Sequence, residues 1–184
     1  IIQYMASMIL LCGTLIVFAQ LSFMRSQSLG VKTNQTLVVK FPGHTEGLNT
    51  KLEAMKKTIA RLPLVYQVTF SGAVPGEEVA TFLSNRRTND ALKQNRLYEM
   101  LACDPDYVDA YGLQVVAGRN FSEDYGDDVD KLVINETAVR NLGFTSNDEA
   151  IGELVNVECT DAPMQIIGVV KDYHQQALSK NYTP

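Results

Sequence analysis

From Ile1 to Met24 the chain carries no charged residue, and this run constrains the fold more than any other feature of the sequence. The part from Tyr4 to Ala19 is nearly all apolar, and a helix needs about 20 such residues to cross a bilayer. A signal peptide would need a basic region before the run and a clean A-x-A site after it, and buried core helices rarely lack charge over this length. We therefore predict a transmembrane helix over residues 1–24. Because the first residue is not Met, we expect the chain to be a segment of a longer protein.

The rest of the composition describes a folded, acidic protein. Of the 184 residues, 46% are hydrophobic and 20% are charged, which is enough to bury a core. The net charge of −5 disfavours nucleic acid and anionic membrane surfaces as partners, because phosphate binding needs a basic face. No dense cluster of Lys and Arg overturns this, so we expect no nucleic acid to bind.

The first elements after the apolar run predict a strand, a helix and a second strand. Residues 36–43 ("TLVVKFPG") and 65–72 ("VYQVTFSG") have the composition of strands. Between them, residues 45–62 form an amphipathic pattern. Its apolar stripe consists of Leu48, Leu52, Met55, Ile59 and Leu62. Short connections between such elements are typical of a split βαβ unit.

The middle of the chain alternates short strands with polar connections. We predict strands over residues 79–84 and 96–104, with a polar loop over residues 85–95 between them. A turn and a short helical segment follow. A further strand is expected at residues 113–116, ending at Gly118.

The stretch Asp130–Phe144 ("DKLVINETAVRNLGF") predicts a strand that runs directly into a capped helix. Asn135 is a good N-cap, and Glu136 in the first turn suits the helix dipole. Leu142 and Gly143 close the helix, because Gly is favoured at the C′ position.

The last elements predict a β-hairpin. A turn at Gly152 precedes "LVNVEC" (154–159) and "MQIIGVV" (164–170), which flank the turn sequence "TDAP". The tail after residue 170 is polar and contains no clear further element. The fold class is therefore α+β, behind a membrane anchor.

Few residues suggest chemistry. Asp172 and His174 could form a general-base pair, and a membrane-anchored hydrolase using them would need a nucleophile, for which Ser179 is the nearest candidate in sequence. Exposed polar residues that close a hairpin are the favoured interpretation. The chain has no Walker A motif and no G-x-S-x-G motif.

Other polar residues also favour structural roles. Asp104, Asp106 and Asp109 could suggest a cation site, but the ligand alternation, glycine and closing Glu of an EF-hand loop are missing. Capping of a turn is favoured, and the acidic run Glu123–Asp130 is typical of a solvated loop. The position of Arg119 after a strand end favours a role in capping backbone carbonyls over a role in binding an anion.

The three cysteines indicate no metal site, because no Cys/His spacing for a metal is present. Cys12 lies in the apolar helix. A disulfide between Cys103 and Cys159 depends on their distance and on the compartment, and the sequence leaves it open.

Four segments in order resemble the extracytoplasmic domain of MacB/FtsX-type ABC transporter permeases. They are "DPDYVDAYGLQVVAGRNFS" (104–122), "LVINETAVRNLGF" (132–144), "AIGELVNV" (150–157) and "IIGVVKDYH" (166–174). The apolar helix and the "TLVVKFPG" segment also fit, so the resemblance covers nearly the whole chain. The residues that match the family motifs are Tyr107, Gly118, Arg119, Phe121, Asn135, Glu136, Leu142, Gly143, Gly152, Gly168 and Asp172. The resemblance implies that they are structural residues.

The resemblance also implies how the chain is divided. Residues 1–24 would be the transmembrane helix, and residues 25–126 the first part of a split α/β subdomain. Residues 127–175 would be a small mixed subdomain, and residues 176–184 the start of the return to the first subdomain.

The function implied is that of a non-catalytic permease domain without a cofactor. Residues after about 25 would lie outside the bacterial cytoplasmic membrane. A separate or fused cytoplasmic ATPase would hydrolyse ATP, and the domain would relay the motion to export, to lipoprotein handling or to a periplasmic or outer-membrane partner. A second permease copy is a further expected partner. A membrane-anchored ligand-binding sensor module is the alternative.

Overall fold

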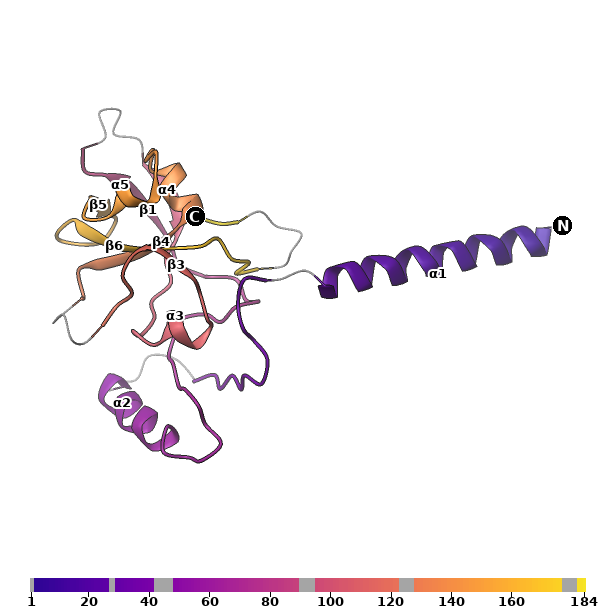
Figure 1. Ribbon diagram of the computed structural model, residues 1–184, viewed down its shortest axis with the longest axis horizontal. Coiled ribbons are helices and arrows are strands. Elements are labelled where there is room, and N and C mark those ends of the chain that lie inside the picture. Colours follow the sequence, from indigo (N-terminus) through magenta and orange to yellow (C-terminus); the bar gives the residue numbers. More distant parts are fainter. Residues whose placement is uncertain (1, 27–28, 42–47, 90–94, 123–127, 177–181) are drawn as a thin grey trace.

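The computed structural model describes residues 2–26, 29–41, 48–89, 95–122, 128–176 and 182–184 (Figure 1). Its helices are α1 (Ile2–Ser26), α2 (Leu48–Ile59), α3 (Tyr107–Ala110), α4 (Glu136–Asn141) and α5 (Asn147–Ala150). Its strands are β1 (Phe82–Arg87), β2 (Arg96–Glu99), β3 (Val115–Gly118), β4 (Lys131–Asn135), β5 (Leu154–Val157) and β6 (Met164–Val170). The predicted α+β class is confirmed.

Helix α1 stands apart from the rest of the chain (Figure 1). Its side chains from Ile2 to Met24 are exposed, although most of them are apolar. By length and composition this helix could cross a membrane. The predicted long apolar helix is therefore present, and the other residues that the structure describes do not cover it.

The six strands form one sheet in the order β2-β1-β5-β6-β3, and β4 pairs with β6 as well. Strand β4 runs parallel to β6, and the other pairs are antiparallel. The predicted hairpin is confirmed, since Val155 of β5 lies opposite Met164 of β6. Strands on both sides of residue 126 share this sheet.

The core lies on both faces of the sheet. Val169 packs in a cluster with Val139 of α4 and Ala150 of α5. Val170, its neighbour in β6, packs in a second cluster with Tyr107 and Val108 of α3. Successive side chains of a strand point to opposite faces, so α4 and α5 cover one face and α3 covers the other (Figure 1).

Two predicted strands were wrong. Residues 36–41 and 65–70 have no regular secondary structure, and only Ser71 beyond them forms an isolated bridge, with Cys103. A strand is stabilised by cross-strand pairs, and no strand in the described part of the chain pairs with these two segments. The helix predicted between them is present as α2, while residues 42–47, including His44, lie outside the described residues.

The borders of the middle strands also differ from the prediction. Strand β1 begins later than residue 79 and continues through Asn85–Arg87, which we assigned to a loop. These polar residues adopt the strand conformation because β1 pairs with β2 on one side and with β5 on the other. Strand β3 begins at Val115 and includes Gly118.

Candidate functional site

The N-terminus of α4 is tied to the end of β6 by two carboxylates. The carboxylate of Asp172 accepts hydrogen bonds from the backbone N–H of Thr137 (2.8 Å), from its hydroxyl (2.9 Å) and from Arg140 (2.8 Å). The carboxylate of Glu136 accepts from the backbone N–H of Asp172 (3.2 Å). The start of α4 and the segment after β6 thus each supply a carboxylate that accepts a hydrogen bond from a backbone N–H of the other. These bonds hold the two segments together.

Both ends of α4 form as the sequence predicts. The side chain of Asn135 accepts from the backbone N–H of Ala138 (2.8 Å), as an N-cap does. At the other end Gly143 has a φ of 83°. The N–H of Phe144 donates to the carbonyl of Val139 (3.1 Å). This pattern is a Schellman motif.

Two motif glycines allow β3 and β6 to approach. Gly118 and Gly168 lie opposite each other in the sheet. A Cβ on Gly118, whose φ is 69°, would lie 2.2 Å from the carbonyl oxygen of Ile167, and one on Gly168 would lie 2.1 Å from that of Arg119. Both contacts are with backbone, so any larger residue would separate the strands.

Arg119 forms a bidentate ion pair. Its Nη1 and Nη2 each lie 2.8 Å from a carboxylate oxygen of Asp128. The hydrogen bonds from Arg119 lower the pKa of Asp128 to about 2, against its usual 3.8. The guanidinium thus connects the residue after β3 to the residues that precede β4. Residues 123–127 of the acidic run lie outside the described residues.

The aspartates before α3 bind a lysine of α2. Lys56 Nζ lies 2.5 Å from an oxygen of Asp104 and 2.5 Å from one of Asp106. Burial would lower the pKa of Lys56, but the hydrogen bonds and charges of the two carboxylates outweigh it and raise the pKa. Thr69 also donates to Asp104, and Asp109 is exposed. Within the described ranges, no cluster of three or more His, Cys, Asp or Glu side chains is arranged to hold a metal ion.

Asp172 and His174 do not form a dyad in the described part of the chain. Asp172 binds Thr137 and Arg140, while the His174 ring stacks on Tyr182 at 4.5 Å between centroids. The candidate nucleophile, Ser179, lies outside the described residues.

The three cysteines are free thiols. Cys103 is partly buried, and burial, with a smaller contribution from the charge of Asp104, raises its pKa to about 11. Cys159 is exposed. The Cys103 thiol therefore stays protonated at neutral pH, and its side chain packs against the core cluster around Tyr107.

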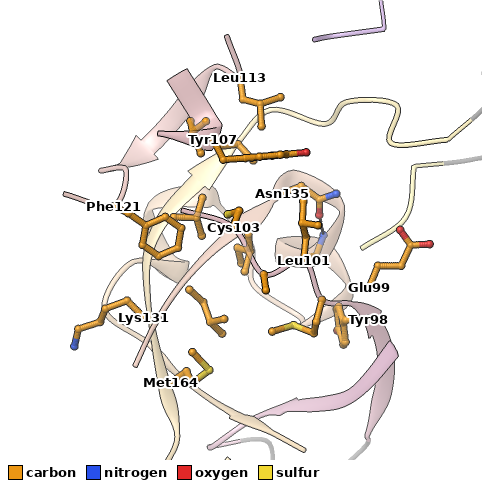
Figure 2. Close-up of a pocket in the computed structure, with 18 of the residues that line it drawn as sticks. Tyr98, Glu99, Leu101, Cys103, Tyr107, Leu113, Phe121, Lys131, Asn135 and Met164 are labelled. Carbon is orange, nitrogen blue, oxygen red and sulfur yellow. Dashed lines mark hydrogen bonds between the residues drawn. The ribbon is translucent and has the colours of Figure 1, made fainter. Parts of the chain in front are cut away.

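A cavity of about 640 Å³ lies against β4 and the chain that follows β2 (Figure 2). Four residues of the motif set line it, namely Tyr107, Phe121, Asn135 and Leu142. Tyr107 is 2% exposed. Burial first, and then the neighbouring Tyr173, raise the pKa of Tyr107, and burial raises that of Tyr173 to about 12. These hydroxyls therefore stay neutral.

This cavity could not be predicted from the sequence, because its walls come from segments far apart in the chain. It is lined mainly by apolar side chains, with a few polar groups at its walls. A volume of this size is in the range of ligand pockets, about 300–1,000 Å³.

A family model described as the MacB-like periplasmic core domain matches residues 6–183. The chain belongs to this family. The resemblance noted in the sequence is therefore confirmed. No curated protein sequence matches the chain.

Two solved structures are similar to this MacB-like domain. The periplasmic region of MacB from Actinobacillus actinomycetemcomitans is 18% identical, with a TM-score of 0.47 over 71% of this chain and 60% of that one. The extracellular domain of the ABC-type transporter YknZ from Gram-positive bacteria is 19% identical, with a TM-score of 0.48 over 71% of this chain and 58% of that one. The chain thus spans less than two thirds of the length of either structure.

Five of the motif residues of the MacB-like domain form two groups. Gly118 and Gly168 lie opposite each other where β3 pairs with β6. Asn135, Glu136 and Asp172 meet at the start of α4. The contacts of both groups hold secondary-structure elements together.

Proposed function

We propose that this chain is the extracytoplasmic domain of an ABC-type permease and is not itself catalytic. In this proposal a cytoplasmic ATPase subunit or domain hydrolyses ATP. The domain couples the resulting motion to export, to lipoprotein handling or to a partner outside the membrane. Helix α1 would lie in the bacterial inner membrane, and residues after about 25 would lie outside it. A second permease copy would complete the transporter.

The observation that carries this proposal is the attachment of the segment after α1. The carbonyl of Leu29 accepts from the backbone N–H of His174 (2.9 Å), and the N–H of Lys32 donates to the carbonyl of Tyr111 (2.8 Å). The segment is therefore bonded to the chain beyond β6 and to the end of α3. A movement of α1 would pull directly on the folded domain.

Gly30 lies in this segment and makes a close approach. Its φ is 77°, and a Cβ on it would lie 3.1 Å from the Cβ of Tyr173. Gly76 has a φ of 100°, but a Cβ there would meet no atom of the described residues within 4 Å. Substitutions at the two positions share backbone strain and differ only in the contact, so they form a matched pair.

The test uses the protein expressed from its own gene and purified from membranes. An ATPase that co-purifies, or is fused, and whose activity is lost when its phosphate-binding lysine is changed would support the permease. In a strain lacking the gene, Gly30→Ala should keep the membrane level and ATPase rate but fail to restore the deletion phenotype, while Gly76→Ala should restore it. Full restoration by Gly30→Ala would contradict coupling through this segment.

A ligand-binding sensor module remains the second candidate, because of the 640 Å³ cavity. A sensor would purify without any ATPase, fused or associated. Recovery of an ATPase with the protein would therefore decide against it.

We also propose the division at residue 126 and the structural role of the motif residues. The close backbone approach at Gly168 and the hydrogen bonds of Asp172 support the structural role of the motif residues. Limited proteolysis tests the division: cleavage near residue 126 should leave two fragments that separate only in denaturant, because the sheet joins them.

A further inference from the structure

Helix α2 is attached to the rest of the described protein through one lysine. Lys56, in the middle of the helix, places its Nζ 2.5 Å from a carboxylate oxygen of Asp104 and 2.5 Å from one of Asp106. Of the α2 side chains that the structure describes, from Lys51 to Ile59, no other makes a hydrogen bond or ion pair outside the helix. The apolar ones are half-buried and belong to neither core cluster.

The contact of Lys56 with the two aspartates is partly shielded from water. The side chain of Lys56 is 18% exposed and that of Asp104 is 12% exposed, while that of Asp106 is 45% exposed. Salt screens shielded charges less than it screens surface pairs, and removal of one partner leaves the other charge unpaired. The contact therefore stabilises the docked helix, and its loss should destabilise the docked helix.

The two carboxylates belong to a well-ordered turn at the start of α3. The backbone N–H of Asp104 donates to the carbonyl of Phe70 (2.9 Å), and the carbonyl of Asp104 accepts from the N–H of Tyr107 (3.2 Å). Asp106 is the N-cap residue of α3, but its side chain makes no capping hydrogen bond. An aspartate at this position usually caps the helix, whereas the carboxylate of Asp106 binds Lys56 instead.

Helix α3 lies between α2 and the sheet and is anchored in the core (Figure 1). Its residues Tyr107 and Val108 are 2% and 4% exposed and belong to the second core cluster. At the other end of α3, the N–H of Lys32 donates to the carbonyl of Tyr111 (2.8 Å). The Lys32 side chain lies over Gly112, where a Cβ would be 2.8 Å from its Cδ. Helix α3 thus connects α2 with the segment that follows α1.

Helix α2 depends on this attachment because it is short. It has 12 residues, and isolated helices shorter than about 12–15 residues are marginal in water. A detached α2 should therefore lose its helical hydrogen bonds together. Neither core cluster would lose a described side chain, so the sheet should stay folded.

We propose that the contact of Lys56 with Asp104 and Asp106 is a releasable attachment, and that α2 detaches and unfolds as one unit while the sheet stays folded. Release breaks two ion pairs and needs no change in either core cluster. Because α3 also binds the segment after α1, a displacement of that segment would act on the aspartates through one short helix. The proposal holds whether the protein is a permease or a sensor, so its test is independent of the ATPase.

The test measures hydrogen exchange, at low urea concentrations, of the protein purified in membranes from its own gene. Corrected for intrinsic rates, the amides of α2 should share one opening free energy and exchange at least about tenfold faster than those of β6. Equal exchange of α2 and β6 at every urea concentration would overturn the proposal, because α2 would then open only together with the sheet.

Three variants show whether Lys56 controls this opening. Lys56→Met removes the charge and should speed exchange in α2 by at least about a further tenfold, while exchange in β6 stays within about twofold. Lys51→Met is the matched control, since Lys51 is an exposed lysine of the same helix, and should change neither rate. Lys56→Arg keeps the charge and should keep most of the protection. Equal effects of Lys56→Met and Lys51→Met, or an equal increase in α2 and β6, would overturn the proposal.

Discussion

Two regions with similar strand-like sequences behave differently in this protein. In the sheet, Val155 of β5 is 1% exposed and Val169 of β6 is fully buried. In the segments beside α2, Leu37 is 87% exposed and Tyr66 is fully exposed, although both lie in apolar, β-branched runs. The difference shows that such a run becomes a strand only when another edge pairs with it.

The largest expected effect comes from the two glycines that hold the sheet region together. Gly168→Ala should cost about 4 kcal/mol or more of unfolding free energy, because its Cβ would lie 2.1 Å from a backbone oxygen. Gly143→Ala is the control, and it should cost about 1–2 kcal/mol. Gly143 has a positive φ, but a Cβ on it would meet no described neighbour within 4 Å. Urea unfolding of the detergent-solubilised protein, followed by circular dichroism, measures both. Equal effects would mean that the strands can separate freely.

The comparison itself is tested by truncating one side chain in each region. Ile166→Ala, at a fully buried position, should cost about 2–5 kcal/mol. Leu37→Ala, at a position that is 87% exposed, should change the unfolding free energy by less than about 0.5 kcal/mol. The same urea titration measures the unfolding free energy of both variants. A large effect of Leu37→Ala would show that its segment is paired in solution.

A smaller loss is expected at the start of α4. Asn135→Ala removes the N-cap bond to Ala138 and the donor to the carbonyl of Thr183, and should cost about 1 kcal/mol. Asn135→Asp keeps the cap and removes only the amide donor, so it should cost less. If the two variants were equally destabilised, the bond to Thr183 would be the important one.

The smallest effect depends on pH. The pKa of Asp128 falls to about 2 in the folded state from its usual 3.8. The ionised carboxylate therefore stabilises the fold at pH values above about 4, and this stabilisation is lost as the pH falls from about 4 towards 2. Arg119→Gln should flatten this part of the curve of unfolding free energy against pH.

Lys40→Gln is the matched control for that curve. It removes an ion pair with Glu77 whose side chains are 73% and 42% exposed, and exposed pairs contribute little. An unchanged pH curve in Arg119→Gln would mean that other carboxylates cause the acid sensitivity.

Local elements of the sheet region could be predicted well. Asn135 and Gly143 mark both ends of α4 because their side-chain and backbone preferences act within a few residues. The hairpin of β5 and β6 has a turn sequence between two apolar runs. The pattern marked Gly118 as a strand end and the family motif included both glycines, but their pairing was not predicted, since it joins residues far apart in the chain.

Long-range features could not be predicted. The pairing of β4 with β6, the ion pair of Lys56 with Asp104 and the cavity all depend on which segments become neighbours. The same limit explains the two wrong strands, whose local preferences are strand-like. Asp172 illustrates it for a single residue, because its neighbour in sequence is His174 while its hydrogen bonds are with Thr137 and Arg140.

By itself, the sequence determined the exposed apolar helix, the α+β class, the capped helix, the hairpin and the family, since these depend on composition, on local preferences and on the order of motifs. Tertiary structure alone decided which apolar runs pair as strands, where each carboxylate is bound and which segments line the cavity. The physical reason is that burial and hydrogen bonding are properties of contacts, and most of these contacts join residues that are distant in the chain.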